Sequence, residues 1–221
     1  MRTKQIQDQD VLYSKGNNDC CDTPRYGVSP ILKYLPKDKI IWCPCDTENS
    51  EYVKVLQENG YNVIYSHIDY GQDYFKYEPE KWDIMVTNPF YTGKREVVQR
   101  ALDFGKPFAL LLPLTWLNDS APVKLFFEKD LQLLMFDKRI KFINNGIVQN
   151  KITFKTAYYC HNLLPKQIIM ERTQNRNSLL KVDNINCCGT KIYTNNHEAA
   201  MSIDLGEYYT EERAKEVLNE I

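Results

Sequence analysis

The segment at residues 87–91, Thr-Asn-Pro-Phe-Tyr, follows an apolar run at residues 83–87 that we predict to be a strand. The Asn88 side-chain oxygen and the Pro89 backbone carbonyl are two acceptors that can take both N–H bonds of one amino group. Because the proline stiffens the turn, these acceptors are held in place before an amine arrives. Tyr91 beside them can stack on a base taken out of a nucleic-acid helix. The motif therefore suits chemistry at an amino nitrogen, although Asn-Pro is also a common turn pair after a strand.

Strands and helices are predicted to alternate around this motif. A first helix is expected to begin at Thr23-Pro24 and to continue through Leu35. The short apolar runs predicted as strands are residues 40–43, 61–65, 83–87, 108–112, 131–136 and 152–160. The helices predicted between them are residues 51–59, 94–104 and 121–129. This order predicts an α/β domain with a mostly parallel sheet and helices on both faces, in which ligands bind beyond the C-terminal strand ends.

The chain divides into three predicted parts. Residues 1–22 show no strong hydrophobic period, and we interpret them as an N-terminal arm. Residues 23–171 hold the alternating strands and helices. Residues 172–221 begin with a polar, Asn-rich connector and end in a segment with a helix-capping start at Thr210, so we predict a small C-terminal α/β module there.

The composition argues against several classes of protein. The seven cysteines are odd in number and include no Cys-x-x-Cys pair, which disfavours both a disulfide framework and a structural zinc site. We therefore expect no bound metal. Residues 1–10 are polar, and no apolar run approaches the ~20 residues that span a membrane. We expect a soluble, cytoplasmic protein that has no membrane partner.

One part of the chain is basic although the net charge is only −1. No acidic residue occurs between residues 138 and 170. A local basic surface of this kind can bind phosphates, and a solvated face balanced by charges elsewhere in the fold is the alternative. The residues that we expect to contact nucleic acid are Lys138, Arg139, Lys141, Lys151 and Lys155.

The motif at residues 87–91 resembles the Asn/Asp-Pro-Pro-Tyr/Phe motif of amino-methyltransferases, a family that includes the adenine-N6 DNA methylases. Phe90 stands where the family has its second proline, and Tyr91 aligns with the family's aromatic residue. Methylase-like proteins of phages and prophages are similar in particular, because they share a Cys-Pro-x-Asp first loop and a Ser-His-Ile strand end with this chain. The resemblance covers about residues 20–165, and the segment after residue 205 looks like a small phage protein of unknown role. The resemblance implies a Rossmann-like methyltransferase domain with Asn88, Pro89, Phe90 and Tyr91 at the target amine.

The resemblance also implies S-adenosylmethionine as the cofactor. The family's glycine-rich loop is replaced here by residues 45–50, which contain no glycine, but this cofactor has no phosphate to cradle. A carboxylate at Asp46 could receive the ammonium group of its methionine part. His67 stands where the family has an acidic ribose ligand, and Asp73 lies in a segment similar to the family's Asp-Phe pair at the adenine ring. The cofactor-binding residues implied are Thr23, Pro24, Pro44, Asp46, His67, Asp73 and Tyr74.

We therefore expect methyl transfer to the exocyclic amine of adenine in nucleic acid, with DNA favoured over RNA. A methyltransferase fold that binds nucleic acid or a host protein without methylating it is the main alternative, because the loop lacks glycines and His67 and Phe90 depart from the family pattern. Methylation of a small molecule or of a protein glutamine is a third hypothesis, which the basic stretch disfavours. A homodimer is also left open.

Overall fold

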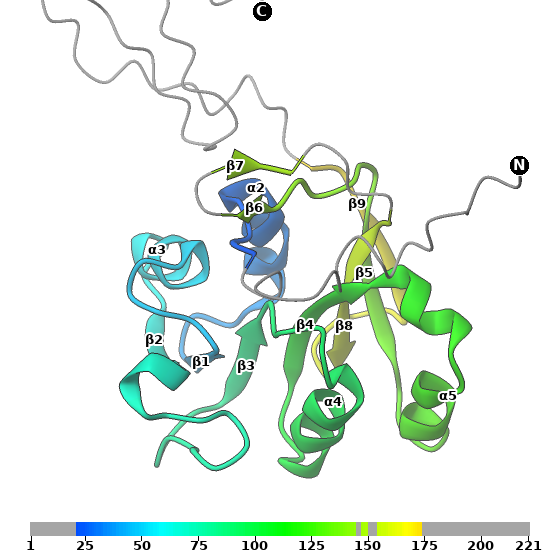
Figure 1. Ribbon diagram of the computed structural model, residues 1–221, viewed down its shortest axis with the longest axis horizontal. Coiled ribbons are helices and arrows are strands. Elements are labelled where there is room, and N and C mark those ends of the chain that lie inside the picture. The colour runs from blue at the N-terminus through cyan, green and yellow to red at the C-terminus, as the bar shows by residue number, and fades with distance from the viewer. Residues whose placement is uncertain (1–20, 145–146, 150–153, 174–221) are drawn as a thin grey trace, which may run out of the picture. The chain divides into compact units, whose positions relative to one another are not determined.

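The computed structural model describes residues 21–144, 147–149 and 154–173 (Figure 1). The chain divides into two units, residues 1–173 and 174–221, and every described residue belongs to the first unit. The arm predicted for residues 1–22 lies outside the described part except for its last two residues. The predicted C-terminal module lies outside it from residue 174 onward, and so does Lys151.

The described residues form a seven-stranded sheet with the order β2-β1-β3-β4-β8-β5-β9. The strands are β1 (Ile40–Pro44), β2 (Asn62–Ser66), β3 (Ile84–Thr87), β4 (Phe108–Pro113), β5 (Gln132–Phe136), β8 (Thr156–His161) and β9 (Ile168–Glu171). β8 runs antiparallel to β4 and β5, whereas the other neighbouring pairs in this sheet are parallel. The expected mostly parallel α/β sheet is therefore confirmed.

Helices cover both faces of the sheet. Within the described residues the α-helices are α2 (Arg25–Val28), α3 (Glu51–Glu58), α4 (Lys94–Asp103) and α5 (Ser120–Phe126). The crossover from β1 to β2 and the crossover from β3 to β4 run in opposite directions along the sheet, so the common right-handed connection puts α3 and α4 on opposite faces. α2 packs with α3 and α4 packs with α5, as two separate groups (Figure 1).

Local sequence explains most of these elements. β4 is buried along all six residues, as expected of a central parallel strand with helices on both sides. Ser50 caps α3 by accepting a hydrogen bond from the Tyr52 backbone N–H. Gly60 follows α3 with φ +76°, the left-handed conformation that glycine commonly adopts at a helix end.

Several predicted boundaries are corrected. The helix expected from Thr23 to Leu35 is only four residues of α2, followed by a 3-10 helix at Ser29–Tyr34, because Pro30 has no N–H with which to continue the α-helical ladder. The helix predicted at residues 121–129 is α5, which ends at Phe126. The edge strand β9 was not predicted, nor were the paired segments β6 (Ile143–Asn144) and β7 (Ile147–Val148). These strands are too short to show a hydrophobic period.

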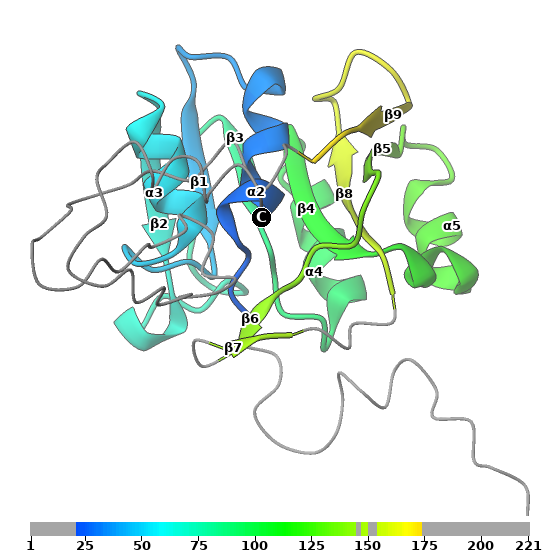
Figure 2. The ribbon, with the colours of Figure 1, turned by 90° about the horizontal axis from the view of Figure 1, so that it is seen from above.

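The segment that enters α2 is held by a backbone contact far along the chain. Asp22 forms an antiparallel bridge with Ile143, with N–O distances of 2.8 and 2.9 Å in the two directions. Figure 2 shows this first described segment running beside β6. Asp22 therefore belongs to the folded unit rather than to a separate arm. Among the described residues there is no helix with the length and apolar character needed to cross a membrane.

Candidate functional site

A cavity of about 580 Å³ lies where β1, β2 and β3 end. β2 lies next to β1 on one side in the sheet, and β3 lies next to β1 on the other side. The connections that follow β1 and β3 therefore leave the sheet toward opposite faces. Ligands of open α/β sheets bind at this switch in strand order. Seven of the residues expected from sequence line the cavity together: Thr23, Asp46, His67, Asp73, Tyr74, Asn88 and Phe90.

The other four expected residues are described but do not line the cavity. Pro24 and Pro44 are buried, and Pro44 contributes its backbone carbonyl to a hydrogen bond beneath the cavity. Pro89 is buried directly after Asn88. Tyr91 is only 7% exposed, and its ring packs edge-on against Phe154 at 6.5 Å between centroids. Tyr91 therefore supports the motif loop, and Phe90 is the aromatic of the motif that faces the cavity.

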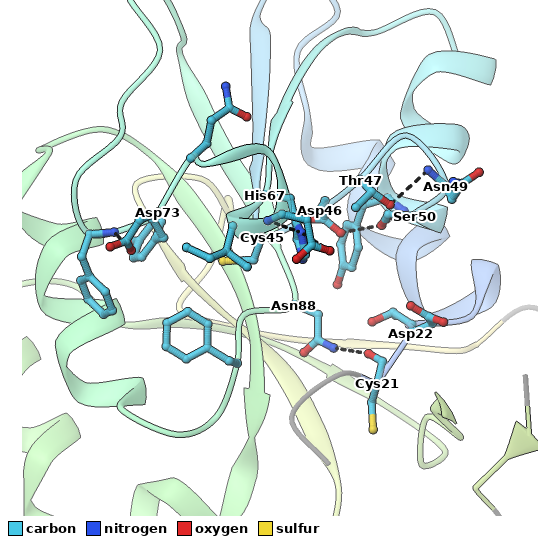
Figure 3. Close-up of a pocket in the computed structure, with 18 residues that line it drawn as sticks. Cys21, Asp22, Cys45, Asp46, Thr47, Asn49, Ser50, His67, Asp73 and Asn88 are labelled. Carbon is cyan, nitrogen blue, oxygen red and sulfur yellow. Dashed lines mark hydrogen bonds and ion pairs between the residues drawn. The ribbon is translucent and has the colours of Figure 1, made fainter. Parts of the chain in front are cut away.

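Asn88 follows the last residue of β3, and its side chain has a fixed orientation. Its Nδ2 donates to the backbone carbonyl of Cys21 at 3.2 Å (Figure 3). Its Oδ1 is buried and has no hydrogen-bond partner among the described residues. A buried acceptor without a donor is costly and calls for an explanation. The explanation offered by this position is a donor on a ligand.

Asp46 follows β1 and is held by three contacts. Its backbone N–H donates to the Ser66 carbonyl at 3.1 Å, which ties the loop to the end of β2. The Ser50 hydroxyl donates to Oδ1, and the Thr87 hydroxyl oxygen lies 2.6 Å from Oδ2. The pKa of Asp46 is raised to about 7, chiefly by burial and to a smaller extent by the nearby charge of Asp22, while the hydrogen bonds with Ser50 and Thr87 oppose the shift. A carboxyl group that titrates near neutrality in a cavity is typical of a functional site.

One residue of the loop after β1 adopts a backbone conformation that is typical of glycine, although the loop contains no glycine. Cys45 has φ +65°, the left-handed conformation that glycine adopts without strain and that costs other residues free energy. Such strain concentrates at binding sites. The resemblance places a glycine-rich loop here, so the missing glycines have not removed this feature of the backbone.

The cavity is acidic. Four carboxyl side chains line it, those of Asp22, Asp46, Asp69 and Asp73, and none of its described lining residues is Lys or Arg. His67 also lines it, with Nδ1 3.2 Å from the Asp69 backbone nitrogen. Phosphate groups are disfavoured in such a site and cations are favoured. No group of three or more metal-ligating side chains suited to a metal ion occurs within the described ranges.

One end of the cavity is aromatic. Phe75 and Phe90 line it with their ring centroids 5.9 Å apart, and 41% of Phe75 is exposed. Asp73 accepts a hydrogen bond from the Phe75 backbone N–H at 3.0 Å, which fixes this turn. In Figure 3, Asp73 lies at the opposite end from Asn49 and Ser50, with Asp46 and His67 between them. A flat ring at the aromatic end and a polar, charged group at the other would match this arrangement.

Sequence reasoning missed Ser50, Tyr52 and Thr87. Tyr158 donates to the Gly27 carbonyl at 3.0 Å, and its oxygen lies 2.9 Å from that of Tyr52, so Tyr52 is the donor between the two hydroxyls. Tyr52 also lines the cavity and can offer it only an acceptor. Ser50 could have been found as a helix cap and Thr87 as part of the motif, but the tyrosine pair joins residues 106 positions apart and leaves no local signal.

No protein-family model matches this chain, and no curated protein matches it. The resemblance stated above therefore depends on the motif residues and on where they lie. Seven of them meet in one cavity, and this geometry is the basis for a functional proposal.

The predicted basic surface lies at the same edge of the sheet as the cavity. Residues 137–155 connect the C-terminal end of β5 to the start of β8, and because β8 is antiparallel its start lies at the C-terminal ends of the parallel strands. Lys138, Arg139 and Lys155 are exposed, and Lys141 is half-buried. The Lys141 backbone N–H donates to the Tyr26 hydroxyl at 2.7 Å, which fixes this segment on α2.

Proposed function

We propose that the chain is a Rossmann-like methyltransferase that uses S-adenosylmethionine to methylate the exocyclic amino group of adenine in nucleic acid. The observation that carries this proposal is Asn88 Oδ1, a buried acceptor without a partner among the described residues, at the end of β3 and beside an acidic cavity. An exocyclic amine is a donor that such an acceptor would bind. The strand order and the switch between β1 and β3 are consistent with this fold.

The cavity fits the chemical groups of the proposed cofactor. Its volume of about 580 Å³ lies within the range of small-molecule sites. The cofactor carries a sulfonium and an ammonium group and no phosphate, which suits a cavity lined by carboxylates and by no described Lys or Arg. Asp46 would hold the ammonium group, and Asp73 with Phe75 would hold the adenine ring at the aromatic end.

The residues of the motif have separate tasks in this proposal. When bound, the cofactor supplies an electrophilic methyl group. Asn88 accepts an N–H of the target amine through Oδ1, which orients the lone pair of the amine nitrogen. Pro89 does not line the cavity, so its expected role as acceptor of the second N–H stays a prediction from the motif. Phe90 covers the target base, whereas Tyr91 keeps the loop in place by packing on Phe154.

The basic segment supports nucleic acid as the substrate. Lys138, Arg139 and Lys155 are exposed at the edge of the sheet where the cavity lies. Phosphates would bind these side chains outside the acidic cavity, while a single base enters it. The phosphate backbone of the nucleic acid would thus bind the basic segment, and the target base would bind the acidic cavity.

A fold that binds without methylating is the second candidate. The absence of glycine from residues 45–50 favours it. The left-handed Cys45 and the Asn88 oxygen, which has no partner among the described residues, indicate a ligand site, which both candidates have, so only a transfer assay separates them.

Two measurements test the proposal. Calorimetric titration with S-adenosylmethionine and with S-adenosylhomocysteine should show binding of both. Radiolabelled methyl transfer to adenine-containing DNA and RNA, followed by nucleoside analysis, should yield N6-methyladenine. Failure of both ligands to bind at millimolar concentration would remove the enzyme proposal. Cofactor binding without methyl transfer to either nucleic acid would favour the second candidate. Methyl transfer to a glutamine-containing peptide and to neither nucleic acid would show that the substrate is a protein amide rather than adenine.

A further inference from the structure

We propose that Asp46 carries a proton in the ligand-free protein, that Thr87 holds this proton in place, and that a cationic group entering the cavity displaces it. The inference rests on the proposed function only for the identity of the ligand. It makes binding at this site depend on pH in a range where most carboxylates are already ionised.

The geometry around Thr87 carries the proposal. Its hydroxyl oxygen lies 2.6 Å from the Pro44 carbonyl oxygen and 2.6 Å from Asp46 Oδ2. A hydroxyl has one hydrogen, which cannot point directly at two acceptors that both lie 2.6 Å away. The contact that does not receive the Thr87 hydrogen needs a hydrogen from its other oxygen. The Pro44 carbonyl oxygen has no hydrogen to donate, whereas Asp46 Oδ2 has one when the carboxyl group is protonated. The chain of bonds therefore runs from Asp46 Oδ2–H to Thr87, and from the Thr87 hydroxyl to Pro44.

The second oxygen of Asp46 is held as an acceptor. Ser50 accepts a hydrogen bond from the Tyr52 backbone N–H at 3.2 Å and gives its own hydrogen to Asp46 Oδ1. The two oxygens of the carboxyl group thus have different partners, and the proton belongs on Oδ2. Asp46 is only 7% exposed, so most of its surface faces these protein groups.

The charges that face Asp46 favour the protonated form. The titratable groups around it are Asp22 before α2, Cys43 and Cys45 on and after β1, His67 after β2, Tyr52 on α3 and Tyr158 on β8. Apart from His67, each of these groups gains negative charge when it ionises. Burial raises the pKa of Asp46 to about 7 against the opposing hydrogen bonds with Ser50 and Thr87.

An entering ammonium group changes this balance. Its charge stabilises the carboxylate, the proton passes to the buffer, and the Thr87 hydrogen turns from Pro44 to Asp46 Oδ2. The ion pair between the ammonium group and the Asp46 carboxylate forms in the same step, and no covalent bond other than the O–H bond of Asp46 is broken. Affinity for a cationic ligand should then rise about tenfold for each unit by which the pH increases toward about 7, and should level off above pH 7. A neutral ligand should show no such dependence.

The first test needs no ligand. Carbon-13 NMR of the aspartate carboxyl groups, assigned with Asp46→Asn, should show Asp46 titrating near pH 7. In the ionised form the Thr87 hydroxyl donates to Oδ2, so Thr87→Val should destabilise the carboxylate and raise the pKa of Asp46 further, while Thr87→Ser should restore it. Titration of Asp46 below about pH 5 would overturn the proposal. An unchanged pKa in Thr87→Val would remove Thr87 from it.

The second test measures proton release on binding. Calorimetry with S-adenosylhomocysteine in buffers of different ionisation enthalpy should report close to one proton released per ligand near pH 6 and almost none near pH 8.5. Methylthioadenosine, which lacks the ammonium group, should release none, and neither should the Asp46→Asn variant with either ligand. Binding without proton release would overturn the displacement step. If neither compound binds, the proposed function fails, while the ligand-free titration still decides the state of Asp46.

Discussion

The side-chain amide of Asn88 donates a hydrogen bond from Nδ2 to the backbone carbonyl of Cys21, 67 residues earlier in the chain. This bond determines which way the amide faces, because reversing it would bring two oxygens together. Oδ1 is therefore the atom that remains for a ligand. The contact also joins the loop after β3 to the segment before α2, which is itself paired with β6 through Asp22 and Ile143.

Asn88→Ala should abolish methyl transfer and leave cofactor affinity nearly unchanged, because the proposed partner of Oδ1 is the target amine. Radiolabelled transfer and calorimetry measure the two quantities separately. Asn62→Ala, at the exposed start of β2, is a matched control that should retain transfer. Transfer that survives in Asn88→Ala would contradict the proposed mechanism.

The two aromatic residues of the motif should respond differently to truncation. Phe90→Ala should weaken binding of an adenine-containing single strand by about 1–3 kcal/mol, since one stacking partner is lost, and should leave stability almost unchanged. Tyr91→Ala should instead lower the free energy of unfolding by about 3 kcal/mol, because the ring is buried against Phe154. Fluorescence titration measures the binding and urea denaturation measures the stability. If Tyr91→Ala weakened binding and Phe90→Ala lowered stability instead, Tyr91 would have the base-stacking role predicted from sequence.

Replacing Phe90 by proline restores the family's residue and tests the motif more directly. The variant should retain transfer, because Asn88 and Pro89 are unchanged. It should lose the ring contact between Phe90 and Phe75. Transfer assays at saturating and limiting substrate separate a loss of binding from a loss of rate. Complete loss of transfer would mean that Phe90 is required where the family uses proline.

The predictions from sequence succeeded where the signal is local. Apolar runs gave the buried strands β1, β3 and β4, because strands covered on both faces are continuously hydrophobic. The cavity residues Asp46, His67 and Asn88 were found because each lies within two residues after the end of a strand, and the ends of parallel strands meet at one edge.

Long-range contacts could not be predicted. The orientation of Asn88 depends on Cys21, and the acceptor role of Tyr52 depends on Tyr158, so neither follows from spacing along the chain. Tyr91 illustrates the same limit, since its neighbour Phe90 has the same apolar character and only packing decides which ring is buried. The edge strand β9 is short and only half-buried at alternate positions, so its hydrophobic pattern is weak.

Cys45→Gly should be more stable than Cys45→Ala. Both variants lose the same sulfur, but only glycine adopts the left-handed conformation of this residue, φ +65°, without strain. We expect a difference of about 1 kcal/mol in the free energy of unfolding, measured by urea denaturation. As a control, the same pair of changes at Cys43, which lies within β1, should favour alanine. Equal stability of the two Cys45 variants would show that the loop is not strained.

The basic segment should make nucleic-acid binding sensitive to salt. If Lys138 and Arg139 contact phosphates, the logarithm of the association constant should fall linearly with the logarithm of salt concentration, and each alanine substitution should reduce the slope by about one. Lys129→Ala, an exposed residue after α5, should leave the slope unchanged. Affinity that does not depend on salt would remove nucleic acid as the substrate.

The stability of the protein should depend on the protonation of Asp46. The pKa of its carboxyl group is about 7 in the folded protein, against an ordinary value of 3.8. The folded state therefore binds more protons than the unfolded state between these values, and stability is lost as the pH rises through about 7. An asparagine at this position imitates the protonated form, since its Nδ2 can donate to Thr87 and its Oδ1 can accept from Ser50.

Asp46→Asn should accordingly equal the wild-type protein in stability near pH 4 and exceed it near pH 8.5, by up to about 4 kcal/mol at about 1.4 kcal/mol per pKa unit. Urea denaturation of both proteins at several pH values measures this difference, and the other titrating groups cancel because they are common to both. Asp46→Leu is the matched control, because it is uncharged but cannot donate to Thr87 or accept from Ser50, and it should be less stable than Asp46→Asn at every pH. A stability difference between Asp46→Asn and wild type that stays constant with pH would show that Asp46 is ionised throughout, and the hydrogen of Thr87 would then belong to Asp46 rather than to Pro44.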